Sequence, residues 1–184
     1  MIVVPAGYHI TDALTNVNIH CMAQDQALKE DIRALRIGIL NIMPKIETYE
    51  FNLLHPLGQS VIQIEPIWIR LVSHSYKSSN QDHLKSLYIS FEDAIKDKHL
   101  DGLILTGAPV EEIPFEEVKY WSELMRILKY AKNNIASTLG ICWGGLALAK
   151  FMGIDKEVYN KKIFGIYQTK NLMKNHKLTG NMDD

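Results

Sequence analysis

The sequence has 184 residues, 47% of them hydrophobic, and a formal net charge of -1. This length and composition predict one compact domain, and the near-zero charge argues against a nucleic-acid-binding protein, which usually presents a basic patch. The first residues carry no basic leader, and the longest apolar stretch, 135–149, is too short to span a bilayer. We therefore expect a cytoplasmic protein with no nucleic-acid or membrane partner.

The two cysteines, Cys21 and Cys142, lie far apart and lack the Cys-x-x-Cys or Cys/His spacing of a metal site. A disulfide between them stays possible on this evidence. Two reduced thiols are the simpler interpretation, and they fit the cytoplasm. We expect no bound metal and no bound cofactor.

Taken in chain order, apolar runs of strand length alternate with segments of helical period. Strands are predicted at residues 36–43, 62–69, 101–107 and 135–141, and helices at 50–57, 91–98, 116–132 and 146–152. Pro66 suits an edge strand or a bulge, and the polar residues 73–83 predict a loop.

Strands that alternate with helices imply right-handed crossovers and therefore a doubly wound, mostly parallel α/β sheet of the flavodoxin-like kind. We assign residues 1–184 to a single domain, with an N-terminal extension at 1–35 and the sheet core at 36–184. Ligands of such sheets bind beyond the carboxyl ends of the strands. The segments that fall at those ends are Met43–Lys45, Thr106–Pro109 and Cys142–Gly144. We therefore predict the functional site there, with Thr106 and Gly107 in contact with substrate.

The segment Gly140-Ile141-Cys142-Trp143-Gly144 joins a predicted strand to a predicted helix in the pattern of a nucleophile elbow. The turn is so sharp that the flanking positions leave no room for a Cβ. The following helix directs its free N–H groups and the positive end of its dipole at the sulfur, which favours the reactive thiolate. The backbone N–H of Trp143 is then placed to stabilise an oxyanion. Cys142 is the candidate nucleophile, and the alternative is a buried, inert cysteine.

Four blocks of the sequence resemble the homoserine O-acyltransferase family, whose fold is that of the class I glutamine amidotransferases. The blocks are Leu40–Lys45 with Ile46–Thr48, Phe91–Asp93, Asp101–Pro109 with Val118–Trp121, and Ser137–Thr138 leading to Cys142–Trp143; a weaker fifth is Lys162–Tyr167. The resemblance implies a ping-pong reaction of methionine or cysteine biosynthesis. Cys142 takes an acyl group from acetyl-CoA or succinyl-CoA as a thioester, and a hydroxyl of homoserine or serine then attacks it. It also implies small-molecule partners and a homodimer.

The resemblance further assigns roles to individual side chains. Lys45 matches a lysine that helps to hold the oxyanion, and the alternative is a surface lysine. Lys162 matches a lysine associated with substrate binding. Glu111 matches the position that is glycine in succinyl-using members and glutamate in acetyl-using ones. A carboxylate lining the acyl pocket repels the carboxylate of a succinyl group, so acetyl-CoA is the expected donor.

The sequence departs from the family at its end. The resemblance places the general base, a His-x-Glu pair, after Asp184, and the only histidine after Cys142 is His176, which falls where the family has a turn. We therefore expect the catalytic histidine and glutamate to be missing from these residues. The alternatives to an acyltransferase are a glutamine amidotransferase, which would need a glycine-rich oxyanion loop, and a catalytically incomplete binding domain of the same fold.

Overall fold

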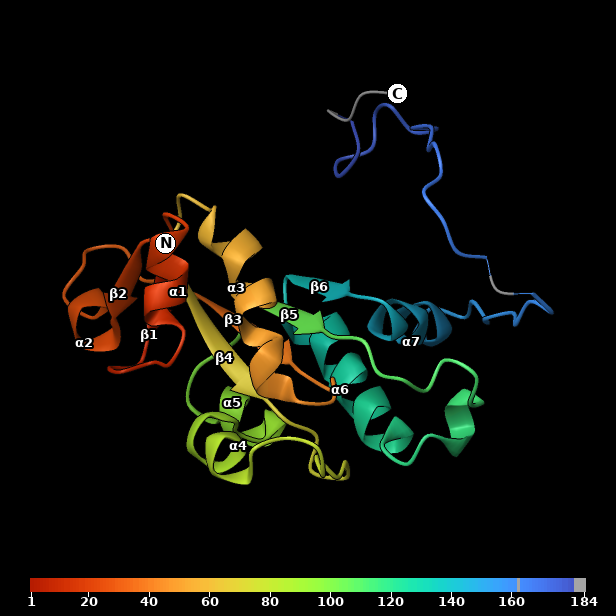
Figure 1. The fold of residues 1–184 in the computed structure, drawn as a ribbon, viewed down its shortest axis with the longest axis horizontal. Helices are drawn as coiled ribbons and strands as arrows, with labels where there is room; N and C mark the ends of the chain where they lie inside the picture. The colour runs from red at the N-terminus through yellow and green to blue at the C-terminus, as the bar shows by residue number, and fades with distance from the viewer. Residues whose placement is uncertain (162, 181–184) are drawn as a thin grey trace.

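The computed structural model describes residues 1–161 and 163–180. Its centre is a six-stranded sheet in which every strand pair is parallel and the order is β2-β1-β4-β3-β5-β6 (Figure 1). The strands are β1 (Ile2–Val4), β2 (Cys21–Ala23), β3 (Leu35–Leu40), β4 (Ile64–Ile69), β5 (Gly102–Leu105) and β6 (Ser137–Gly140). The predicted doubly wound, parallel α/β fold is confirmed.

Helices connect the strands. They are α1 (Thr11–Asn16), α2 (Gln24–Ala27), α3 (Glu50–Gly58), α4 (Gln81–Leu87), α5 (Phe91–Lys96), α6 (Trp121–Asn134) and α7 (Trp143–Phe151), with short 3-10 turns η1 (Ile46–Thr48) and η2 (Phe115–Glu117). In the part of the chain that the structure describes, none of these helices combines the length and the apolar character needed to cross a membrane.

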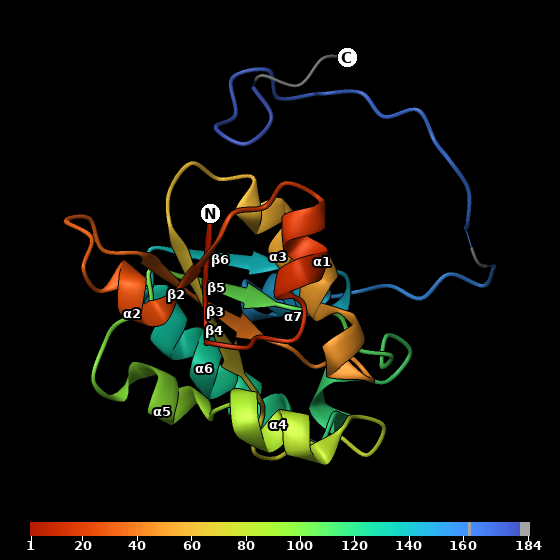
Figure 2. The same cartoon turned by 60° about the vertical axis from the view of Figure 1, so that its left-hand side comes forward.

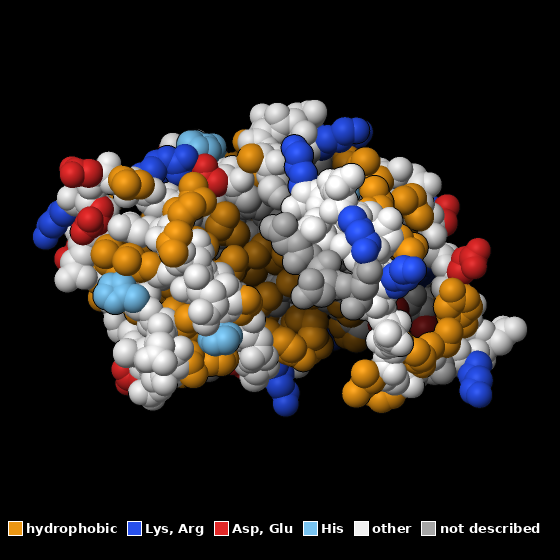
Figure 3. Space-filling model, turned by 90° about the horizontal axis from the view of Figure 1, so that it is seen from above, with side chains coloured by type: hydrophobic (Ala, Val, Ile, Leu, Met, Phe, Trp, Pro, Cys, Tyr) orange, Lys and Arg blue, Asp and Glu red, His pale blue; other side chains and the backbone are white. Residues whose placement is uncertain are grey.

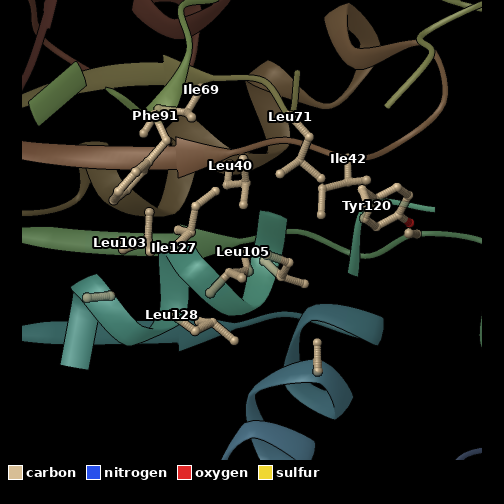
Figure 4. Close-up of a cluster of buried hydrophobic side chains, with 14 of the residues drawn as sticks. Leu40, Ile42, Ile69, Leu71, Phe91, Leu103, Leu105, Tyr120, Ile127 and Leu128 are labelled. Carbon is tan, nitrogen blue, oxygen red and sulfur yellow. The ribbon is translucent and has the colours of Figure 1, made fainter. Parts of the chain in front are cut away.

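The two faces of the sheet carry separate apolar cores, with α5 and α6 on one side and α1 and α3 on the other (Figure 2). In α6, the buried residues Leu124, Ile127, Leu128 and Ala131 follow one another at helical spacing, as the sequence pattern predicts. Leu103 and Leu105 of β5 point toward this helix (Figure 4). Each such Leu or Ile stabilises the fold by roughly 1.5–3 kcal/mol through burial.

Strands β1 and β2 come from residues 1–35, the segment predicted as an extension ahead of the sheet core. The structure places both strands in the sheet, where Ile2, Val3 and Val4 pair with Cys21, Met22 and Ala23. Each strand has three residues, which is too few to show an alternation of apolar and polar positions. Residues 1–35 therefore extend the sheet beyond β4.

Pro66 lies in β4, between β1 and β3 rather than at a sheet edge. Its position is tolerated because β1 meets β4 only at the pair Ile2 and Ile64, so the side of Pro66 that lacks an N–H has no neighbouring strand to bond. The predicted loop 73–83 ends earlier than expected. The side chain of Asn80 accepts hydrogen bonds from the N–H groups of Asp82 and His83 and starts α4 at Gln81.

The face of β6 opposite α6 is open to solvent. Leu139 pairs with Ile104 of β5, whose side chain points away from α6, and Leu139 is 55% exposed.

Seen from above, the middle of the molecule is hollowed and lined with hydrophobic side chains (Figure 3). After α7 the described residues form no helix or strand, and the chain leaves the body of the domain (Figure 1).

Candidate active site at the carboxyl ends of the strands

Cys142 occupies a sharp turn between β6 and α7. Its backbone has φ 54° and ψ -124°, a conformation that residues with a Cβ rarely adopt. Trp143 is the first residue of α7, so its N–H lies outside the hydrogen-bond ladder of the helix and beside the cysteine. The structure therefore has the elbow geometry that the sequence pattern predicts.

The glycines on both sides of Cys142 are required by close backbone contacts. A Cβ on Gly140 would lie 2.5 Å from the carbonyl oxygen of Gly144. A Cβ on Gly144 would lie 2.6 Å from the carbonyl oxygen of Leu105, on the neighbouring strand. Gly145 has more room, since its Cβ would lie 3.2 Å from the nearest atom, the carbonyl oxygen of Gly140. The elbow thus packs backbone against backbone where side chains cannot fit.

The thiol of Cys142 is free and exposed, which excludes the alternative of a buried, inert cysteine. Cys21 is also free but half-buried, and burial raises the pKa of its thiol. Its sulfur donates only a long hydrogen bond, 3.9 Å, to the carbonyl oxygen of Ile19. Of the two cysteines, Cys142 is therefore the one placed to meet a substrate.

The ends of β3 and β5 converge on the elbow. A Cβ on Gly107 would lie 3.2 Å from the sulfur of Cys142 and 3.3 Å from the sulfur of Met43. Thr106 lies beneath this surface and is buried, and its hydroxyl accepts a hydrogen bond of 2.8 Å from the N–H of Ile42. Gly107 thus borders the thiol, whereas the Thr106 hydroxyl joins the two strand ends.

Lys45 follows Met43 by two residues, on the loop between β3 and η1. It is exposed, and its backbone is left-handed, with φ 52°. The structure gives its ammonium group no hydrogen bond or ion pair with a described residue. Lys45 is thus an exposed cation two residues after Met43 that is available to a ligand.

The other two predicted substrate-binding residues lie farther along the chain. Glu111 is exposed on the loop after β5, and its carbonyl oxygen accepts a hydrogen bond from the ammonium group of Lys156. Lys156 also donates to the carbonyl oxygen of Ile113, at 2.6 Å. Lys162 lies outside the described residues.

No histidine of residues 1–161 and 163–180 is hydrogen-bonded to the Cys142 thiol. His176 lies in the segment after α7, where its Nδ1 accepts a hydrogen bond of 3.2 Å from the N–H of Leu178. His9 and His83 instead contact the carboxylate of Glu50, which is 0% exposed. The sequence does not predict this buried carboxylate, because Glu50 lies in an ordinary helical segment and no motif around it indicates burial or function.

A hollow of about 610 Å³ lies beside the amino ends of β3 and β5. Arg33, Arg36 and His99 are among its lining residues. Its lining includes no cysteine, serine or threonine, and in parallel α/β sheets ligands bind at the other end. The chemistry of Cys142 therefore identifies the better candidate site.

A sequence model of the homoserine O-succinyltransferase family matches residues 1–184. The chain belongs to this family. Homoserine O-acetyltransferase 1 of Ilyobacter polytropus is 43% identical over 184 residues, which are 100% of this chain and 61% of that protein. A homoserine O-acetyltransferase of Bacillus cytotoxicus is 44% identical over 172 residues, which are 93% of this chain and 57% of that protein.

A homoserine O-acetyltransferase of Roseobacter denitrificans is 41% identical over 170 residues, which are 92% of this chain and 55% of the relative. The chain thus spans 55% to 61% of the length of these three relatives. The resemblance to the homoserine O-acyltransferases that the motifs predict is confirmed by these matches within the homoserine O-succinyltransferase family.

Proposed function

We propose that this chain carries the acyl-accepting site of an enzyme that transfers an acetyl group from acetyl-CoA to the hydroxyl of homoserine. The observation that carries the proposal is the exposed thiol of Cys142 on an elbow at the amino end of α7. A thiolate at a helix amino terminus is favoured by the helix dipole and by unpaired N–H groups. Membership of the homoserine O-succinyltransferase family supplies the substrate class.

In the first half-reaction, the sulfur of Cys142 attacks the thioester carbonyl carbon of acetyl-CoA. The carbonyl oxygen becomes an oxyanion, which the N–H of Trp143 and the ammonium group of Lys45 are proposed to stabilise. The C–S bond to coenzyme A then breaks, coenzyme A leaves as a thiolate that takes up a proton, and acetyl-Cys142 remains.

In the second half-reaction, the homoserine hydroxyl attacks acetyl-Cys142 and releases the thiol. This step needs a base to accept the hydroxyl proton, and a positioned base contributes about 10²–10⁴-fold. The family resemblance predicts a His-x-Glu pair for this role. Serine as the acceptor differs from homoserine by one methylene, which is worth only about 1–3 kcal/mol of discrimination.

The test of the proposal is whether Cys142 becomes acetylated. Incubation of the chain with acetyl-CoA should add one acetyl group by intact mass, and peptide mapping should place it on Cys142. Cys142→Ala should remove this adduct, whereas Cys21→Ala should keep it, since Cys21 is half-buried. An adduct that persists in Cys142→Ala and maps elsewhere would contradict the assignment.

Acetyl rather than succinyl is proposed because of Glu111, whose carboxylate would repel the carboxylate of a succinyl group. The relatives named above carry the name homoserine O-acetyltransferase, which supports the same donor. Glu111→Gly should raise the rate of Cys142 succinylation relative to acetylation, and Glu112→Gly is the matched control. If Glu111→Gly leaves the ratio of succinylation to acetylation unchanged, Glu111 does not line the acyl pocket.

The proposal includes a cytoplasmic setting, which the two free thiols support.

The proposal also includes a homodimer. Exposed apolar side chains at Leu139 and Ile141, which are 55% and 40% exposed, support an association through this face. Light scattering of the purified chain measures the oligomeric state, and a monomer at all concentrations would contradict this part of the proposal.

A further inference from the structure

Glu50 is a buried carboxylate that four side chains surround. Its Oε1 accepts hydrogen bonds from Nε2 of His83 at 2.6 Å and from the hydroxyl of Tyr88 at 2.9 Å. Its Oε2 accepts hydrogen bonds from the hydroxyl of Tyr8 at 2.5 Å and from Nε2 of His9 at 2.8 Å. The side chain of Glu50 is 0% exposed, so these four donors replace water entirely. We call these five residues the Glu50 cluster.

The Glu50 cluster is better explained as a hydrogen-bonded centre than as a metal site. The side-chain nitrogens of His9 and His83 and the carboxylate of Glu50 lie within 4.8 Å of one another. Each oxygen of Glu50 already accepts two hydrogen bonds, so a cation would have to displace donors. Burial, followed by the charge of Glu50, raises the pKa of Tyr8 and Tyr88 far above the usual tyrosine value. Both hydroxyls therefore keep their protons and donate to Glu50.

Tyr88 links the Glu50 cluster to the loop that carries Lys45. Because the Tyr88 proton is committed to Glu50, its oxygen can only accept from Asn41, whose Nδ2 lies 3.1 Å away. This contact adds to the backbone contacts that set the orientation of the Asn41 amide. Nδ2 then donates to the carbonyl oxygen of Ile46 at 3.3 Å, and Oδ1 accepts from the N–H of Met43 at 3.2 Å.

The amide of Asn41 therefore ties together both ends of the segment 43–46. Lys45 lies inside this segment with a left-handed backbone, which is strained for a residue with a Cβ. A second hydrogen bond holds the far end, since the N–H of Ile46 donates to the hydroxyl of Ser79 at 3.3 Å. The near end is held by Thr106, which accepts from the N–H of Ile42 and lies next to Gly107.

We propose that Glu50 is a positioning residue for acyl transfer, which acts through Tyr88 and Asn41 to hold Lys45 at the oxyanion of Cys142. This inference rests on the proposed function, because it gives Lys45 its role there. Glu50→Gln removes the charge and one of the two acceptor oxygens, so Tyr88 loses part of its anchor. The Asn41 amide is then held less tightly, and both ends of the segment 43–46 loosen. The backbone that carries the Lys45 side chain is then no longer held at one place.

The test compares Glu50→Gln and Tyr88→Phe with the wild type in the rate of Cys142 acetylation by acetyl-CoA. Displacement of a catalytic group by about 1 Å costs about 10- to 100-fold in rate, so we expect falls of this size in both variants. The maximal rate should fall while the half-saturating concentration of acetyl-CoA stays the same. Asp101→Asn is the matched control, since it removes a carboxylate at the opposite end of the sheet and should leave the rate unchanged.

Loss of Lys45 separates positioning from a general loss of structure. In a Lys45→Met background, Glu50→Gln should change the rate by less than about twofold, because the group on which it acts is absent. If Glu50→Gln keeps the wild-type rate, or lowers it equally in both backgrounds, the inference is overturned.

Hydrogen exchange distinguishes a failure of this inference from a failure of the proposed function. If the wild type forms no acetyl-Cys142, the proposed function fails, and exchange in residues 41–48 becomes the test of Glu50. Faster exchange there in Glu50→Gln, with no change in Asp101→Asn, supports the positioning of the loop. Exchange at the wild-type rate in Glu50→Gln overturns it.

Discussion

The backbone of Gly107 lies directly against the thiol of Cys142. A Cβ at Gly107 would lie 3.1 Å from the Cβ of Cys142 and 3.2 Å from its sulfur. This contact brings the end of β5 to the elbow that follows β6, and the sulfur of Met43 borders the same position from β3. A side chain at Gly107 would therefore crowd the thiol of Cys142.

Gly107→Ala should slow the acetylation of Cys142 about tenfold, because the added methyl group displaces the thiol by a few tenths of an ångström and narrows its approach. The melting temperature should fall little, since Gly107 does not have a positive φ and its nearest contacts, at 3.1 to 3.3 Å, need to give by only a few tenths of an ångström. Stopped incubations analysed by intact mass measure the rate. An unchanged rate would show that acyl groups do not pass over Gly107.

Gly144→Ala should destabilise the fold by about 1–3 kcal/mol, the usual cost of overpacking. Its Cβ would meet the backbone oxygens of Leu105 and Thr106 at 2.6 Å and 2.7 Å, and neither can move without disturbing β5. Gly145→Ala is the matched control, since its nearest contact is 3.2 Å. Urea denaturation of both variants measures the difference. Equal losses would mean that the tight approach of Gly144 to β5 is not maintained in solution.

The elbow could be predicted from the sequence because the pattern that marks it is local. The glycines at positions 140 and 144, the apolar strand before them and the helix after them are contiguous, so pattern and geometry coincide. The same holds for α6, whose apolar spacing alone predicts which face is buried. The helix begins at Trp121, later than the predicted residue 116, since residues 115–117 form a separate 3-10 turn.

The Glu50 cluster could not be predicted because its members meet only through tertiary packing. Tyr8 and His9 precede α1, Glu50 begins α3, His83 lies on α4 and Tyr88 follows it. An acid at the first position of a helix is common, and nothing local predicts that it is buried.

Lys45→Met should lower the rate of Cys142 acetylation about 10²–10³-fold, the usual loss when one oxyanion donor is removed. Methionine keeps the length of the side chain and removes only its charge and donors. Lys129→Met is the matched control, since Lys129 is exposed on α6. Equal rates for the wild type and Lys45→Met would mean that backbone N–H groups alone stabilise the oxyanion.

Asp101 stabilises the far end of the sheet in a way that depends on pH. Its two oxygens accept hydrogen bonds from the guanidinium group of Arg33 at 2.7 Å and 2.8 Å, and from the N–H of Arg36 at 2.8 Å. The hydrogen bonds from Arg33 are the largest cause that lowers the pKa of Asp101 below its usual value. A carboxyl group with a lower pKa in the folded state stabilises the fold above its unfolded pKa of about 3.9.

Asp101→Asn should therefore lower the melting temperature at pH 7, where the wild-type carboxylate is fully ionised. As the pH falls below about 4 toward the folded pKa, the wild type loses this contribution and its melting temperature should approach that of the variant. Asp31→Asn is the matched control, since Asp31 is exposed and the described residues offer it no ion pair; no gap is expected there at any pH. A gap for Asp101→Asn that stays constant from pH 7 to pH 3 would mean that its hydrogen bonds, and not its charge, stabilise this edge of the sheet.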